Sequence, residues 1–233
     1  MKVKSIILGL SLLALIGCDA NVPMEVTDKP NVKFGTFTDP RDGHVYKTVT
    51  IGSQTWLAEN LRYYKNKPIS YGGNRSDTEE KYYIYGFDGT NSSTTAEQNY
   101  DKYGILYNYP AAKASVPTGW RLPTSEDFET LRSTVGRFYN GKYWNYAGIF
   151  RMLLCVDEAG SYAYSASSGF NGQKCCFYKG DYAYTGRDYM MYWTSETYSY
   201  YDAYVYSIDD DYYYTRREKF DNYYGFPVRC IKK

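Results

Sequence analysis

The residues of this chain that could carry out catalysis are few and far apart. His44 is the only histidine among 233 residues, and the sequence contains five cysteines. A histidine acts as a general base only where a nucleophile lies within hydrogen-bond reach, and no serine or cysteine is locally marked as a partner for His44. We therefore expect no catalytic residues and a protein that is not an enzyme. A hydrolase or oxidoreductase that depends on His44 or Cys175 is the alternative.

Metal coordination is indicated just as weakly. Asp209, Asp210 and Asp211 could attract Ca²⁺, an ion that takes about six to eight oxygen ligands in a set geometry. Consecutive side chains on a strand point to opposite faces of the sheet, so we interpret this run as a solvated turn. The sequence contains no CxxC pair of the kind that zinc sites use. We predict neither a metal nor a cofactor.

The first residues have the pattern of an export signal with a lipid attachment site. Lys2 and Lys4 precede an apolar run over residues 5–16, which is too short to span a bilayer as a stable helix. The run leads into Leu-Ile-Gly-Cys, the pattern of a bacterial lipobox, whose cysteine, Cys18, would receive a diacylglycerol. An ordinary secretory signal with a coincidental cysteine is the alternative.

This signal divides the chain into three parts. Residues 1–17 are a lipoprotein signal peptide, and residues 18–33 are the lipidated N-terminus and a tether that carries two prolines. Residues 34–233 form one domain, which suits the length of the chain. We expect a protein held in the bacterial outer membrane by the lipid on Cys18, on the cell surface in preference to the periplasmic leaflet.

Export would place the remaining cysteines in an oxidising compartment. Cys155, Cys175, Cys176 and Cys230 allow three pairings, which the sequence leaves open. We expect at least one long-range disulfide that joins Cys230, near the C-terminus, to the middle of the chain.

Tyrosine is concentrated near the C-terminus. Residues 188–224 contain twelve of the 31 tyrosines, together with eight acidic and three basic side chains. An acidic segment in a chain with a net charge of +1 disfavours a nucleic-acid partner. Tyrosine offers a large contact area and a polar tip while it fixes few torsions, and it is therefore frequent in binding surfaces. We predict that a protein or glycan ligand contacts Tyr198, Tyr200, Tyr201, Tyr204, Tyr206, Tyr212, Tyr213 and Tyr214.

Alternation within this segment predicts a strand. Tyr204, Tyr206 and Ile208 fall on one face, and Ala203, Val205 and Ser207 fall on the other. One face should pack on the core, and the other should offer its side chains to solvent or a partner. In the alternative interpretation tyrosine is a filler residue, and the protein is a structural envelope lipoprotein without a specific ligand.

Local patterns predict the elements that hold this surface. Residues 44–51 and 54–58 read as two strands joined by Gly52 and Ser53. Residues 62–100 are polar and poorly periodic, which favours a long surface loop. A short helix begins near Pro110, since proline is tolerated in a first helical turn. A longer helix follows Thr124, which can cap it together with Asp127.

The remaining predictions concern the core and the C-terminus. The longer helix should bury Phe128, Leu131 and Val135 on one face and end near Gly136. The segment 223–231 closes the chain with a strand through Val228 and Cys230. We expect the core and scaffold to include Trp56, Trp120, Trp193, Phe226 and Val228.

A series of short motifs occurs in a fixed order along the chain. The motifs are Asp39-Pro40-Arg41-Asp42-Gly43, Tyr46-Lys47-Thr48-Val49, Ile51-Gly52, Gln54-Thr55-Trp56-Leu57-Ala58-Glu59-Asn60-Leu61, Tyr103-Gly104, Leu106-Tyr107, Gly119-Trp120-Arg121-Leu122-Pro123, Trp193-Thr194-Ser195-Glu196 and Tyr224-Gly225-Phe226-Pro227-Val228-Arg229-Cys230. In that order the chain resembles the Fibrobacter succinogenes major paralogous domain over roughly residues 35–232.

The resemblance implies an α+β chain with a C-type lectin-like fold, close to that of formylglycine-generating enzymes. Two helices would surround a small, mostly antiparallel sheet whose terminal strands pair, with long irregular loops. The adjacent Cys175 and Cys176 do not match the separated redox pair of those enzymes, and Val116 replaces a cysteine that the family usually has. The family also includes variable proteins of diversity-generating retroelements, which implies that residues 188–224 are a diversified region.

Overall fold

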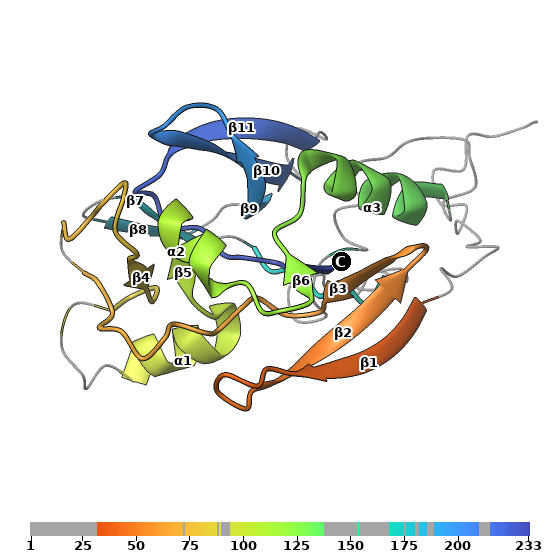
Figure 1. Ribbon diagram of the computed structural model, residues 1–233, viewed down its shortest axis with the longest axis horizontal. Helices are drawn as coiled ribbons and strands as arrows, with labels where there is room; N and C mark the ends of the chain where they lie inside the picture. The colour runs from red at the N-terminus through yellow and green to blue at the C-terminus, as the bar shows by residue number, and fades with distance from the viewer. Residues whose placement is uncertain are drawn as a thin grey trace, which may run out of the picture.

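The computed structural model shows an α+β chain with mostly antiparallel sheets, which confirms the predicted class (Figure 1). It describes residues 32–71, 73–87, 89, 94–137, 153, 168–174, 176–179, 182–185, 189–209 and 215–233. The signal peptide and most of the tether lie outside these residues, and the first strand begins at Val32. The helices are α1 (Thr94–Tyr103), α2 (Tyr109–Ser115) and α3 (Ser125–Arg137). The strands are β1 (Val32–Thr38), β2 (Val45–Ile51), β3 (Gln54–Leu57), β4 (Tyr82–Tyr83), β5 (Leu106–Tyr107), β6 (Trp120–Arg121), β7 (Cys176–Lys179), β8 (Tyr182–Thr185), β9 (Tyr189–Thr197), β10 (Asp202–Asp209), β11 (Thr215–Asp221) and β12 (Ile231–Lys232).

A five-stranded sheet brings the two ends of the domain together in the order β1-β2-β3-β12-β6. The predicted hairpin of residues 44–51 and 54–58 is confirmed as β2 and β3, with Gly52 in the turn at φ +61°. That positive φ favours glycine. The first and last strands share this sheet, although β2 and β3 separate β1 from β12.

A second sheet, in the order β11-β10-β9, packs against α3 on one face and against α2 on the other (Figure 1). Tyr206 and Ile208 of β10 lie in the core around α3, whereas Ala203 and Val205 lie in the core around α2. The central strand of this sheet is therefore buried on both faces. The expectation that one face presents tyrosines to solvent is wrong at this strand, because a helix covers each side.

Both helices that the sequence predicts are present. Thr124 Oγ1 accepts a hydrogen bond from the Asp127 amide at 3.1 Å, and Asp127 Oδ2 accepts one from the Thr124 amide at 2.6 Å. This reciprocal capping starts α3, which buries Phe128, Leu131 and Val135 as expected and continues one residue beyond Gly136. Asn108 caps α2.

The prediction of a long surface loop over residues 62–100 is wrong in two places. Tyr82 and Tyr83 of β4 are fully buried, and α1 begins at Thr94. The sequence does carry a weak helical pattern there, since Ala96, Tyr100 and Tyr103 have the spacing of one helix face. Their small number hides the pattern among polar neighbours.

The predicted strand over residues 223–231 is only partly present. Regular pairing is confined to β12, whereas residues 225–231, which we call the C-terminal strap, run through the centre of the molecule fully or almost fully buried. The strap exchanges backbone hydrogen bonds with Tyr107 of β5 and Tyr178 of β7. Its carbonyls also accept from Leu61 and Trp193. It changes partners too often to be one strand.

The predicted core is confirmed, but the predicted disulfide is not. The residues Trp56, Trp120, Trp193, Phe226 and Val228 are all buried. Cys230 is a free, buried thiol in the core around α2, so the expectation of a long-range disulfide at this residue is wrong. Val116, at the position where the resemblance implies a cysteine, packs against the same core. Cys155 and Cys175 lie outside the described residues.

Within the described part of the chain, every helix is too short or too polar to cross a membrane.

Candidate functional site

Three of the predicted ligand-binding tyrosines lie in the short connection between β9 and β10. The exposed fractions of Tyr198, Tyr200 and Tyr201 are 59%, 74% and 59%. We call residues 198–201 the tyrosine tip. Large aromatic side chains with this much accessible area are few among the described residues, so the tip is a distinct feature of the surface.

The backbone of the tyrosine tip is held by a dense set of hydrogen bonds. Ser199 Oγ accepts from the amides of Tyr201 and Asp202, each at 3.1 Å, and lies 2.7 Å from Asp202 Oδ2. Asn222 donates through its backbone N–H to the Tyr201 carbonyl at 2.7 Å and through its side-chain Nδ2 to the Tyr200 carbonyl at 2.9 Å. The exposed rings therefore project from an ordered turn.

Contacts among side chains orient the rings further. Tyr200 and Tyr201 meet edge to face with their centroids 4.8 Å apart. Lys219 Nζ lies 4.5 Å from the centroid of the Tyr198 ring, and this ring meets Tyr204 edge to face at 5.9 Å. Aromatic pairs and cation–π contacts of this geometry each stabilise an arrangement modestly, by about 0.5–1.5 kcal/mol.

Of the other predicted tyrosines, the structure describes Tyr204 and Tyr206, and neither is part of the tyrosine tip. Tyr206 is wrong as a contact residue, because only 1% of it is exposed and its ring stacks on Phe128 at 4.7 Å. Its hydroxyl donates to Glu129 Oε1 at 2.5 Å, and burial, followed by this bond, raises the pKa of the phenol well above its usual value. Tyr204 is half-buried beneath Arg217, whose Cζ lies 4.0 Å from the ring centroid. The remaining three, Tyr212, Tyr213 and Tyr214, lie outside the described residues.

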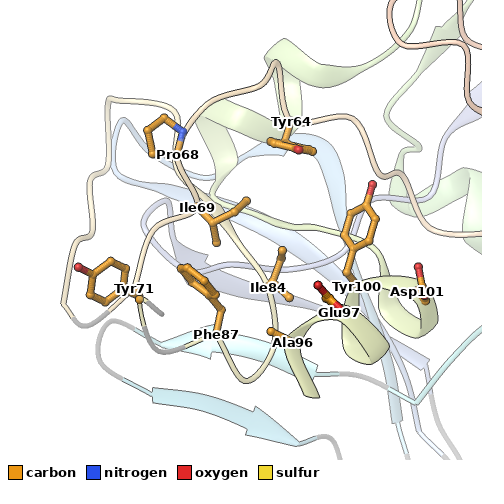
Figure 2. Close-up of a pocket in the computed structure, with 11 residues that line it drawn as sticks. Tyr64, Pro68, Ile69, Tyr71, Ile84, Phe87, Ala96, Glu97, Tyr100 and Asp101 are labelled. Atoms are coloured by element: carbon orange, nitrogen blue, oxygen red, sulfur yellow. The ribbon is translucent and has the colours of Figure 1, made fainter. Parts of the chain in front are cut away.

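A pocket that the sequence did not suggest lies beside α1. Figure 2 shows its walls, which come from the loop before β4, the turn after β4 and one face of α1. We call this the α1 pocket; its volume is about 650 Å³, within the range of about 300–1,000 Å³ typical of small-molecule sites. It is lined by Tyr64, Pro68, Ile69, Tyr71, Ile84, Phe87, Gly89, Ala96, Glu97, Tyr100 and Asp101.

No direct signal in the sequence predicts this pocket. Its residues fall in the segment interpreted as a surface loop, and their rings are spaced without a period. Only the helical spacing of Ala96 and Tyr100 could have placed part of it, by predicting that one face of a helix turns toward the protein.

Of the two residues considered for catalysis, His44 is described by the structure, and Cys175 lies outside the described residues. His44 Nε2 lies 3.6 Å from Glu59 Oε2, and its ring meets the Tyr46 ring edge to face at 4.4 Å. These contacts hold the side chain at the start of β2. No described group of three or more histidine, cysteine, aspartate or glutamate side chains is arranged to hold a metal ion.

Comparison with known proteins matches the sequence to one family. A family model described as the Fibrobacter succinogenes major domain matches residues 49–232. The match begins within β2 and ends in β12, and it therefore includes the tyrosine tip, the α1 pocket and the C-terminal strap. No curated protein and no solved structure matches the chain.

Proposed function

The chain belongs to the Fibrobacter succinogenes major domain family, and from this premise we propose that it is an envelope lipoprotein that binds a protein or glycan ligand through the tyrosine tip. The proposal includes a C-type lectin-like scaffold that presents the tip. The observation that carries it is the exposure of Tyr198, Tyr200 and Tyr201 on a hydrogen-bonded turn.

The physical argument concerns the cost of ordering a binding surface. Binding normally immobilises loops and side chains, which reduces affinity. At the tip, Ser199 and Asn222 already order the backbone, and the edge-to-face contact of Tyr200 with Tyr201 already restricts the rings. Tyrosines on a rigid turn supply contact area at low entropic cost and dominate many interfaces.

The test removes the rings and retains the turn. The variant Tyr198→Ala/Tyr200→Ala/Tyr201→Ala should lose at least about tenfold in affinity for any ligand found on printed glycan and protein arrays, because aromatic anchors carry most of an interface's energy. Its melting temperature should stay close to that of the unaltered protein. Phe34→Ala is the matched control, since Phe34 is 71% exposed on β1, away from the tip.

Two results would count against this function. If the triple variant and Phe34→Ala lose binding equally, the effect is not specific to the tip. If the arrays are blank for the unaltered protein, the tip has no ligand of either class.

The anchor is tested separately. Cys18→Ser should move the protein from the membrane fraction to the soluble fraction and abolish incorporation of labelled fatty acid, because a diacylglycerol supplies the membrane affinity. Protease added to intact cells should degrade the protein if it faces outward. Incorporation of labelled fatty acid into Cys18→Ser at the level of the unaltered protein would refute lipid anchoring at this residue.

Diversification by a retroelement is supported by composition and constrained by the fold. Substitution of Tyr192 or Tyr206 would disrupt the core around α3, so variation could be tolerated only at exposed positions such as the tyrosine tip. A nearby genomic copy of the codons for residues 188–224 that differs only at adenines, beside a reverse transcriptase gene, would test this directly.

A structural role without a specific ligand is the second candidate. The observation in its favour is that many tyrosines are core residues, among them Tyr46, Tyr82, Tyr83, Tyr107, Tyr109, Tyr192 and Tyr206. Tyrosine therefore serves packing in much of this fold. Blank arrays together with a cell-envelope defect in a deletion strain would favour this function.

A further inference from the structure

We propose that the α1 pocket binds a small organic cation, a ligand with an alkylammonium group on an apolar stem. This site is separate from the tyrosine tip and does not depend on the function proposed for it. In Figure 1, α1 and the sheet of β9, β10 and β11 lie on opposite sides of α2, β4 and β5.

The walls of the pocket favour a ligand that is both apolar and cationic. Tyr64, Tyr71, Phe87 and Tyr100 contribute aromatic rings, and Ile69 and Ile84 lie between them (Figure 2). An ammonium group held over aromatic faces is attracted by their negative potential. A volume of about 650 Å³ exceeds the needs of one ammonium group, so an apolar stem would fill the remainder.

The charges of the lining residues agree with this assignment. Among the described residues that line the pocket, Glu97 and Asp101 carry carboxylates, and none carries a positive charge. Both carboxylates are on exposed residues, and no ion pair within the described chain involves them. An anionic ligand would meet repulsion at this pocket, whereas a cation would gain a partner.

The cation that contacts the Tyr100 ring, Arg62, is already engaged by other groups. Arg62 Cζ lies 5.5 Å from the centroid of the Tyr100 ring, and its Nε lies 3.5 Å from Glu59 Oε2. Its remaining nitrogens donate to the carbonyls of Tyr100 at 2.9 Å and Asp101 at 2.6 Å. Arg62 therefore secures the end of α1, and it leaves the carboxylates of Glu97 and Asp101 to a ligand.

The hydrogen-bonding groups also argue against a neutral sugar. The polar side-chain groups of the lining residues are the acceptor-only carboxylates of Glu97 and Asp101 and the phenol hydroxyls. A sugar presents both donors and acceptors, and its acceptors would find only phenols here. An alkylammonium group needs acceptors or π faces, and the pocket offers both.

The walls are held in place before any ligand arrives. Asn99 Nδ2 donates to the Tyr85 carbonyl at 2.9 Å, which ties α1 to the turn after β4. The rings of Tyr71 and Phe87 meet edge to face at 5.8 Å. Gly89 has a φ of +98°, and a Cβ there would lie 2.5 Å from the Tyr71 ring. Any side chain at this position would displace that wall.

The experiment compares two probes of the same shape that differ in charge. Choline and 3,3-dimethylbutan-1-ol, its uncharged carbon isostere, are titrated into the mature protein and followed by isothermal titration calorimetry and by NMR of the probe. We expect choline to bind at least about tenfold more tightly than the isostere. Its affinity should fall as NaCl is added, because exposed carboxylates are screened by salt.

Variants then assign the binding to the pocket. Glu97→Gln/Asp101→Asn should lower choline affinity about fivefold or more and leave the isostere unchanged. Glu126→Gln is the matched control, because Glu126 is an exposed carboxylate in the first turn of α3, outside the pocket. All three proteins should melt at the same temperature, since each substituted residue is exposed.

Several outcomes would overturn the proposal. Equal affinity for choline and the isostere would show an apolar pocket without charge selection. Binding of methyl glucoside in place of choline, or of phosphatidylcholine vesicles without free choline, would assign a different ligand. Absence of binding by all of these probes would remove the site. The triple variant of the tyrosine tip should bind choline normally, so failure of one proposal leaves the other standing.

Discussion

The tyrosine tip and the C-terminal strap lie close in sequence and differ in almost every physical respect. The tip exposes three aromatic rings, and its backbone bonds are satisfied within the turn and by Asn222. The strap, residues 225–231, is fully or almost fully buried. Its backbone bonds reach Leu57, Leu61, Tyr107, Tyr178 and Trp193, which are distributed over much of the chain.

Arg229 gives the strap its most unusual contact set. The side chain has no exposed area, and its Nη1 donates to the carbonyls of Leu57 at 3.2 Å and Phe170 at 2.6 Å. Its Nη2 donates to Asn60 Oδ1 at 2.7 Å and to the Asn171 carbonyl at 3.2 Å. These oxygens replace the water molecules that the guanidinium loses when it is buried. One residue thereby links three separate segments.

The two regions therefore have different roles: the strap stabilises the fold, and the tip forms an exposed surface. Substitutions in the strap break contacts that connect distant segments, whereas substitutions of the tip rings change only the surface. A binding surface placed on such a turn can change its side chains without endangering the fold.

The largest loss of stability is expected from Arg229→Met. The substitution keeps an apolar stem but leaves four oxygen acceptors, three of them in buried hydrogen bonds, without this donor, and we expect the free energy of unfolding to fall by about 4 kcal/mol. For a chain of this size the melting temperature should fall by roughly 8–16 °C. Urea titration followed by circular dichroism measures the change.

Arg229→Lys sharpens this test. Lysine keeps the charge but lacks the planar fork that reaches acceptors on both sides. It should therefore recover less than half of the lost stability. If Arg229→Met costs under 1 kcal/mol, the strap is not the connecting element described above.

Tyr206 and Tyr200 allow a buried and an exposed side chain of the same type to be compared for their contribution to stability. Tyr206→Ala removes a buried ring that stacks on Phe128 and should lower the free energy of unfolding by about 3 kcal/mol. Tyr200→Ala removes a ring that is 74% exposed and should change it by less than about 0.5 kcal/mol. Equal losses in urea titrations of the two variants would show that the tip belongs to the core.

Sequence predicted those elements whose signals are local. The hairpin of β2 and β3 follows from alternation and from Gly52, and α3 follows from Thr124, Asp127 and its apolar face. Trp56, Trp120 and Trp193 were placed in the core correctly, because so large an apolar surface is seldom left in water. Exposure of Tyr198, Tyr200 and Tyr201 was also predicted.

What the sequence did not predict depends on contacts between distant segments. The alternation in β10 cannot reveal that helices cover both faces, so Tyr206 was assigned to the surface although it is buried. The strap has no fixed partner and hence no period. Pairing of Cys230 was expected from the compartment, whereas the structure buries it as a free thiol. The α1 pocket arises where three segments meet, and no pattern within any one of these segments predicts it.

The last predicted change concerns the pH dependence of stability, which involves Cys230 of the strap. Burial raises the pKa of the Cys230 thiol from 9.0 to about 12, so the folded protein keeps a proton that the unfolded chain releases above pH 9. The stability that this neutral thiol contributes is complete below pH 9 and is lost as the pH rises toward 12. By pH 10 the loss from this group should be about 1.4 kcal/mol.

Cys230→Ala isolates that loss from the other groups that titrate in alkali. Buried tyrosines such as Tyr206, whose pKa is also raised, destabilise the variant and the unaltered protein alike. The difference in unfolding free energy between the two proteins should therefore shrink by about 1.4 kcal/mol between pH 8 and pH 10. Urea titrations at both pH values measure it. A difference that stays constant would mean that Cys230 ionises equally in the folded and unfolded chains, which is incompatible with a strap sealed from water.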